Sequence, residues 1–339
     1  MRFLALIATT AFLLVPQQDT PAALASEMDR IRAEASASTP ESENAQPAAR
    51  LARARAALDA HRPLLALYLS EIPWERAKAW TFVKGSSAVT TSDAFAKKWA
   101  AVGEPRPAPA AAADGGRRPA MIDAIAAAAE ARGAITYHAS RSYGEDAGVA
   151  AGLYYLGDSQ AVVQFAAFAR SLTWTPSGAT PPFRSIAPEI TAFDTEMTTA
   201  YESMGRASHS TYIVASAALK QARTLEERGQ YAGALLEYLL SRYIFAPLRG
   251  PAAQEASVER IDEARKGLRA GIDHSIAELF LQLAEEGVAG SVPAQRRGAA
   301  AAIEDVIPAY LRAIAPAATA AAAAAHADVT ITLVRWPFT

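Results

Sequence analysis

Apolar side chains recur every three or four residues along most of this chain, the spacing that places them on one face of an α-helix. The clearest stripes are Ala215, Ala218, Leu219, Ala222 and Leu225, and then Val258, Ile261, Leu268, Ile272, Ile276, Leu279 and Leu283. Alternation with the period of a β-strand is confined to the C-terminus. The pattern predicts an all-α fold, either a helical bundle or an α-solenoid, with a short C-terminal extended strand.

The helix signals divide the chain into many short segments. The predicted helices cover residues 26–37, 48–60, 63–72, 75–83, 92–102, 120–132, 134–142, 146–156, 158–172, 186–204, 208–228, 231–246, 252–286 and 293–314. Ser26 and Asp29 have the spacing of a capping box, which marks a helix start. Residues 38–47 are polar and predict a loop. Pro73 predicts a break, because proline cannot donate the backbone hydrogen bond of a helix interior.

Residues 103–119 are rich in proline, alanine and glycine and contain no large apolar side chain. Such a segment buries too little apolar surface to fold by itself, so it predicts a linker. We therefore expect an N-terminal helical unit over residues 26–102 and a main helical domain over residues 120–327.

The end of the chain differs from the rest. Residues 328–334 alternate β-branched and polar side chains, which predicts a strand, and an aromatic tail follows. This tail either covers the helical core or docks on a partner. The candidate partner-contact residues lie in this tail and around the proline-rich loop 174–182: Trp174, Phe183, Arg335, Trp336 and Phe338.

The N-terminus has the pattern of an export signal. Met1 and Arg2 precede an uncharged apolar run over residues 3–15, and Ala23, Leu24 and Ala25 form a small-x-small site. We expect residues 1–25 to be a signal peptide or an N-terminal anchor, and the protein to reside in the periplasm or cell envelope. The run is too short for a helix that spans the hydrocarbon core of a membrane.

Composition and charge exclude several classes of site. The chain has 33 Lys and Arg against 35 Asp and Glu, and this balance gives no basic surface for nucleic acid. It has no cysteine, which excludes disulfides, thiolate zinc sites and Cys-ligated iron–sulfur clusters. About a quarter of the residues are alanine, the strongest helix former, so we expect closely packed helices.

Two segments share a pattern of small, large, glycine and aromatic positions. The first contains Ala222, Leu225, Gly229, Tyr231, Ala234 and Tyr238, and the weaker second contains Ala150, Leu153, Gly157, Val162, Ala166 and Ala169. The first resembles a tetratricopeptide repeat, a helix–turn–helix unit, and the second resembles a weaker copy of it, so the resemblance covers about two helix pairs. That resemblance implies a concave surface that binds a peptide or protein, without catalysis. A generic helical bundle explains the same residues.

The sequence contains no recognised catalytic or metal-binding motif. His274 and Glu278 lie four residues apart, as two metal ligands do, but no third ligand is identifiable and an ion pair explains the spacing. The polar run over residues 137–146 combines histidine, hydroxyls and carboxylates, yet no nucleophile is fixed beside a base. We predict no cofactor and no metal.

These features favour an exported, non-catalytic scaffold or protein-binding component of the cell envelope, for example an extrinsic subunit of a membrane-embedded complex. Its contact with the membrane itself is expected to be peripheral or through the N-terminal segment. The alternative is a periplasmic helical enzyme or solute-binding protein whose pocket is built from distant helices. This alternative requires a cleft with convergent titratable side chains.

Overall fold

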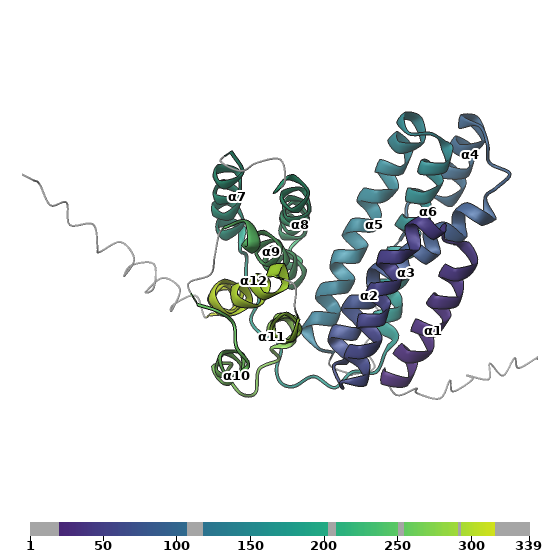
Figure 1. The fold of residues 1–339 in the computed structure, drawn as a ribbon. Helices are drawn as coiled ribbons and strands as arrows, with labels where there is room; N and C mark the ends of the chain where they lie inside the picture. The colour runs from purple at the N-terminus through teal and green to yellow at the C-terminus, as the bar shows by residue number, and fades with distance from the viewer. Residues whose placement is uncertain (1–19, 107–117, 203–207, 250–253, 291–292, 316–339) are drawn as a thin grey trace, which may run out of the picture.

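The computed structural model describes residues 20–106, 118–202, 208–249, 254–290 and 293–315, and every regular element within these ranges is a helix (Figure 1). The predicted all-α fold is confirmed. Outside the helices, the loop after α6 forms one parallel bridge between Ala179 and Ile272. The predicted C-terminal strand and aromatic tail lie outside the described residues.

The first layer contains the N-terminal helices, which run roughly side by side (Figure 1). They are α1 (Thr20–Ser38), α2 (Glu41–Asp59), α3 (Pro63–Gly85), α4 (Ser92–Val102), α5 (Ala120–Asp146) and α6 (Val149–Ser171). The pair α5 and α6 packs through small and β-branched side chains, including Ala126, Ala129 and Val162. A methyl group added at Gly133 would lie 2.7 Å from the side chain of Val163. The expected close helix packing is confirmed here.

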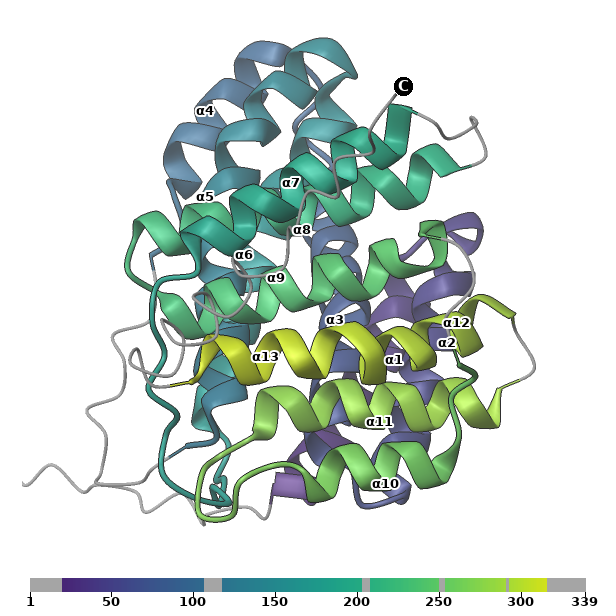
Figure 2. The same cartoon turned by 90° about the vertical axis from the view of Figure 1, so that its left-hand side faces the viewer.

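The second layer contains the remaining helices, which Figure 2 shows stacked one above another across the helices of the first layer. They are α7 (Ala187–Glu202), α8 (His209–Glu227), α9 (Tyr231–Phe245), α10 (Val258–Lys266), α11 (Ser275–Ala289), α12 (Pro293–Ala301) and α13 (Ile307–Ala313). A 3₁₀ turn follows α9 over Ala246–Leu248. A π-helical turn over Ala302–Val306 joins α12 to α13.

The two layers meet where α5 contacts α8 and α9. Ala127, Ala131 and Ala234 form a small buried cluster there with Leu225. At Gly233 an added methyl group would lie 3.2 Å from the Cβ of Ala127, so the helices approach closely. The main core cluster contains residues from both sides of the predicted linker. The predicted division of the chain at residues 103–119 stays a prediction.

Several predicted helix boundaries were wrong. Residues 41–47 belong to α2, and α3 continues through Pro73. Both Pro47 and Pro73 are buried, so packing of the surrounding helical face outweighs the hydrogen bond that each proline removes. The four segments predicted between residues 120 and 172 are two long helices. Their internal glycines permit close contacts instead of turns, as at Gly157, which lies against Phe82.

The helix predicted over residues 252–286 was also wrong, because the chain forms α10 and α11 with a loop between them. Gly271 in this loop has a φ of 80°, a backbone conformation that favours glycine. Asp273 follows it and accepts a hydrogen bond from the backbone N–H of Ser275 at 3.1 Å. These contacts end one helix and begin the next.

Only the first of the two repeat-like segments forms a helical hairpin. There, α8 and α9 are joined at Gly229, whose φ is 70°. The second segment lies inside the continuous helix α6, so its Gly157 is no turn. The tetratricopeptide resemblance itself stays a prediction.

The export signal also stays a prediction, and residues 1–19 lie outside the described part. The helix α1 begins at Thr20, and the Leu24 side chain is buried in the core with 1% exposure. Cleavage after Ala25 would therefore remove a packed turn of α1.

Candidate functional site

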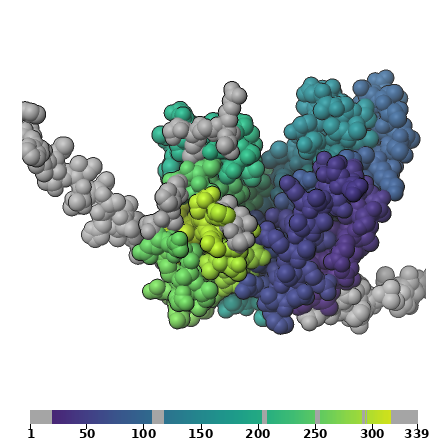
Figure 3. All heavy atoms as spheres, in the orientation of Figure 1, coloured from purple at the N-terminus to yellow at the C-terminus, as the bar shows by residue number. Residues whose placement is uncertain are grey.

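A cavity of about 200 Å³ opens between the two layers. Figure 3 shows the surface hollowed between the lobe that carries α8 and the helices of the first layer. The polar side chains that line this interlayer cavity come from α2, α3, α5, α8 and α9: Arg50, Tyr68, Glu71, Arg132, Gln221 and Glu237. Its remaining lining is apolar and includes Ile125, Leu236 and Leu240. Residues far apart in the sequence thus converge in one place.

Arg132 of α5 pairs with two carboxylates of α3. Its guanidinium lies 2.7 Å from the carboxylate of Glu71 and also donates a hydrogen bond to Glu75. Glu71 and Glu75 share a face because they are four residues apart on one helix. Burial by itself would lower the pKa of the Arg132 guanidinium. The negative charges of Glu75 and Glu71 have the larger combined effect, so the pKa of Arg132 is raised. Burial raises the pKa of Glu75 well above its usual range, with Arg132 opposing this effect.

Glu237 of α9 is the unusual member of this group. Glu237 is only 7% exposed, and its side chain lines the cavity. No hydrogen bond joins its carboxylate to any other described residue. Burial raises its pKa from 4.5 to about 8; the charge of Arg132 opposes this rise and that of Glu71 adds to it. A buried carboxylate without a donor is costly to ionise. Glu237 is therefore the polar group of the cavity that lacks a partner.

The other polar side chains of the cavity have their hydrogen bonds within the protein. Arg50 donates to the backbone carbonyl of Leu69 at 3.1 Å, and its guanidinium lies over the Tyr68 ring, 5.2 Å from the ring centroid. Gln221 donates to the carbonyl of Ala128 at 2.6 Å. These side chains hold α2, α3, α5 and α8 together around the cavity.

Asp158 of α6 belongs to the same electrostatic group, because it interacts with Arg132 and Glu71. Burial raises its pKa to about 6, with Arg132 and Arg76 opposing this effect and Glu71 adding to it. Carboxyl groups with raised pKa values cluster at functional sites more often than elsewhere. Asp158 does not line the cavity, so it acts on the site only through its charge.

The side chains that line the cavity supply hydrogen-bonding groups and apolar surface. They include no serine, cysteine or histidine, so no nucleophile with a neighbouring imidazole is present there. Within the described ranges, no group of three or more His, Cys, Asp or Glu side chains is arranged to hold a metal ion. The cavity combines apolar walls with one unpaired carboxyl group, as small-molecule sites do.

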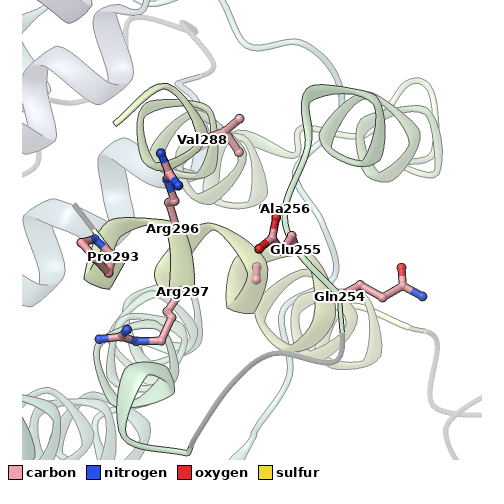
Figure 4. Close-up of a pocket in the computed structure, with 8 residues that line it drawn as sticks. Gln254, Glu255, Ala256, Val288, Pro293, Arg296 and Arg297 are labelled. Atoms are coloured by element: carbon pink, nitrogen blue, oxygen red, sulfur yellow. The ribbon is translucent and has the colours of Figure 1, made fainter. Parts of the chain in front are cut away.

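A larger groove of about 540 Å³ lies between α12 and the segment before α10 (Figure 4). Its charged lining is exposed and consists of Glu255, Arg296 and Arg297. Arg296 donates from Nε to the carbonyl of Gly290 at 3.2 Å. Because this groove contains no buried polar side chain without a partner, the interlayer cavity is the stronger candidate.

Two of the contact residues predicted from the sequence, Trp174 and Phe183, do not line the cavity. Trp174 is half-buried and donates to the carbonyl of Ala169 at 3.2 Å, and Phe183 is half-buried against the core. Arg335, Trp336 and Phe338 lie outside the described residues. Their role in partner contact stays a prediction.

His274 and Glu278 do not form the ion pair that their spacing predicted. His274 is buried, and its ring nitrogens lie 2.9 Å from the Tyr310 hydroxyl and 3.0 Å from the Arg269 carbonyl. Glu278 pairs with Arg265 instead, at 3.1 Å. Both side chains therefore have structural partners.

Sequence reasoning missed the cavity residues, although a signal was present. Glu237 is the only acidic residue in a helix that is otherwise mostly apolar, and Glu71 and Glu75 interrupt an apolar helix at a spacing of four residues. Acidic side chains in apolar helices are rarely buried unless they have a partner or a function.

The comparisons with known proteins give no relative. No family model, no curated protein and no solved structure matches the chain. Among the helices that the structure describes, none is long and apolar enough to cross a membrane.

Proposed function

We propose that this protein is a non-catalytic binding protein and that the interlayer cavity is its ligand site. The observation that carries the proposal is Glu237, a residue only 7% exposed whose carboxyl group lines the cavity and has no hydrogen bond to another described residue. A buried polar group without a partner inside a folded protein calls for an explanation, and a ligand that supplies the missing donor is one.

An enzyme that uses Glu237 as a general acid is the competing function. Such an acid usually works beside a second, ionised carboxylate that faces the substrate. The other carboxylate that lines the cavity, Glu71, is bound by Arg132, which also binds Glu75. This arrangement favours binding over hydrolysis.

The surface around the cavity is suited to a protein partner as well as to a free solute. Ile72 and Val214 line its mouth and are 39% and 53% exposed, and Ile213 beside Val214 is 50% exposed. Exposed apolar side chains around a polar site are typical of contact surfaces. A scaffold role in the cell envelope, proposed from the sequence, therefore uses the same face of the molecule.

The test is to isolate the protein gently from the envelope of its own cells and to measure its native mass. Wild-type protein should carry a bound small molecule or migrate with a partner. In Ala218→Trp the indole fills the cavity, and the bound species should be lost. Lys220→Trp places the same side chain on an exposed position of α8 outside the cavity and should retain it. Wild-type protein with neither a bound molecule nor a partner would refute the proposal.

Export is a separate part of the proposal, supported by the apolar run over residues 3–15 and by the absence of cysteine. N-terminal sequencing of the protein recovered from the envelope fraction tests it. A mature chain that starts before Leu24 keeps this buried side chain in the core, whereas a start at Ser26 removes it. Recovery of the protein in the cytoplasm alone, with Met1 retained, would contradict export.

A further inference from the structure

One polar group of the interlayer cavity has no partner. Two carboxyl groups, Glu71 and Glu237, and two guanidinium groups, Arg50 and Arg132, line the cavity, while Glu75 binds Arg132 from outside the lining. Arg132 is occupied by Glu71 and Glu75, and Arg50 donates to backbone carbonyls. Glu237 is left without a donor, because both guanidinium groups are already bound to other acceptors.

The size of the cavity limits the occupant. Its volume of about 200 Å³ is below the roughly 300–1,000 Å³ of sites for drug-sized ligands. It is above the roughly 150 Å³ of an apolar cavity that holds benzene. The occupant is therefore a group of a few non-hydrogen atoms.

The lining of the cavity has a polar part and an apolar part. Glu237 supplies carboxyl oxygens that accept hydrogen bonds, while Ile125, Leu236 and Leu240 contribute apolar wall. An anion would meet guanidinium groups that are already occupied, and a neutral apolar molecule would leave Glu237 unpaired. A metal ion is disfavoured because the described residues assemble no set of three or more suitable ligands.

We propose that the interlayer cavity binds a primary ammonium group on a short apolar stem, with Glu237 as its ion-pair partner and the apolar walls covering the stem. This inference rests on the proposed function and deepens it. An ammonium group is compact and has three N–H donors, so it supplies what Glu237 lacks. The chemistry has two sources, a free alkylamine or the lysine side chain of a partner protein.

Binding should be coupled to a proton. Because burial holds the pKa of Glu237 near 8, an ammonium group that favours its ionised form displaces a proton below that pH. The charged and titratable groups that line the cavity with it are Arg50 from α2, Tyr68 and Glu71 from α3, and Arg132 from α5. Glu75 of α3 and Asp158 of α6 interact with Arg132 and Glu71 from outside the lining. The affinity should therefore rise with pH between about 7 and 9, while an alkylamine with a pKa near that of lysine, about 10.4, remains charged.

The experiment is calorimetric titration of the full chain at pH 8.5 with n-pentylamine and, as matched neutral probe, n-pentanol. Pentylamine should bind at least tenfold more tightly than pentanol. Glu237→Gln should reduce the pentylamine affinity at least tenfold, whereas Glu227→Gln, which removes the same charge from an exposed position, should not change it. At pH 7 the heat of binding should depend on the ionisation enthalpy of the buffer for wild type but not for Glu237→Gln.

A second pair of probes distinguishes the two sources. N-acetyl-lysine-N-methylamide should bind more tightly than pentylamine if the natural ligand is a lysine side chain, with the norleucine analogue as its uncharged control. Tighter binding of pentylamine identifies a free amine. Both results support an ammonium site.

The inference is overturned if neither amine binds, if pentanol binds as well as pentylamine, or if Glu237→Gln binds pentylamine as wild type does. Its failure differs from failure of the proposed function. A native ligand that Ala218→Trp excludes, but that pentylamine does not displace, leaves the binding function intact and refutes only the ammonium chemistry.

Discussion

Glu237→Gln should change the pH dependence of stability in a defined direction. Gln has almost the same shape as Glu but cannot ionise. In the wild type, burial raises the pKa of this carboxyl group from 4.5 to about 8, so between these pH values the folded state binds a proton that the unfolded state has released. The free energy of unfolding therefore falls as pH rises through this window. The stabilisation is complete below about pH 4.5 and lost above about pH 8.

The magnitude follows from the same pKa. Each tenfold change in acid dissociation corresponds to about 1.4 kcal/mol, so a pKa raised from 4.5 to about 8 sets an upper limit of ~5 kcal/mol on this contribution. Because the residue is only 7% exposed, solvent screening removes little of it, and we expect roughly 3–5 kcal/mol.

The assay is urea unfolding at intervals from pH 4.5 to pH 9 for wild type and Glu237→Gln, without added ligand. The difference between the two free energies of unfolding isolates this position from Glu75 and Asp158, whose pKa values are also raised. Wild type should lose stability relative to Glu237→Gln as pH rises, and Glu227→Gln should follow wild type. A difference that stays constant or grows in favour of wild type with pH would refute the reasoning.

The remaining predictions concern helix packing, and urea unfolding measures each. Gly133→Ala should destabilise the protein by about 1–3 kcal/mol, since its new methyl group would lie less than 3.0 Å from valine side chains of α6. Gly85→Ala places its methyl group in open space and should be neutral or stabilising. Equal effects of the two variants would contradict the packing argument. Gly229→Ala should cost about 1–2 kcal/mol because its φ is 70°, and an unchanged midpoint would show that the turn relaxes. Arg242→Met should cost about 1–3 kcal/mol, because the half-buried carboxylate of Asp305 loses both hydrogen bonds from Arg242 but keeps the Arg249 guanidinium at 2.6 Å. An unchanged free energy of unfolding would mean that Arg249 and water replace the lost pair.

Part of the candidate site was readable in the sequence. Glu71 and Glu75 lie four residues apart in an apolar helix, and helical periodicity alone places them on one face. What the sequence did not reveal is that this face meets Arg132 of α5 and Glu237 of α9, more than 50 and 150 residues away along the chain. Hydrophobic periodicity is a local signal and carries no information about which helices become neighbours.

The helical state was determined by the sequence, because alanine content and a 3.6-residue apolar period act within each segment. The turn at Gly229 was determined in the same way, since it needs a left-handed backbone that glycine adopts freely. The helix limits were decided by tertiary packing: Pro73 stays inside α3 and Gly157 inside α6 because their faces are buried against other helices. Burial likewise decided the interlayer cavity, because only the crossing of two helical layers reduces the exposure of Glu237 to 7% and leaves its carboxyl group at the cavity without a donor.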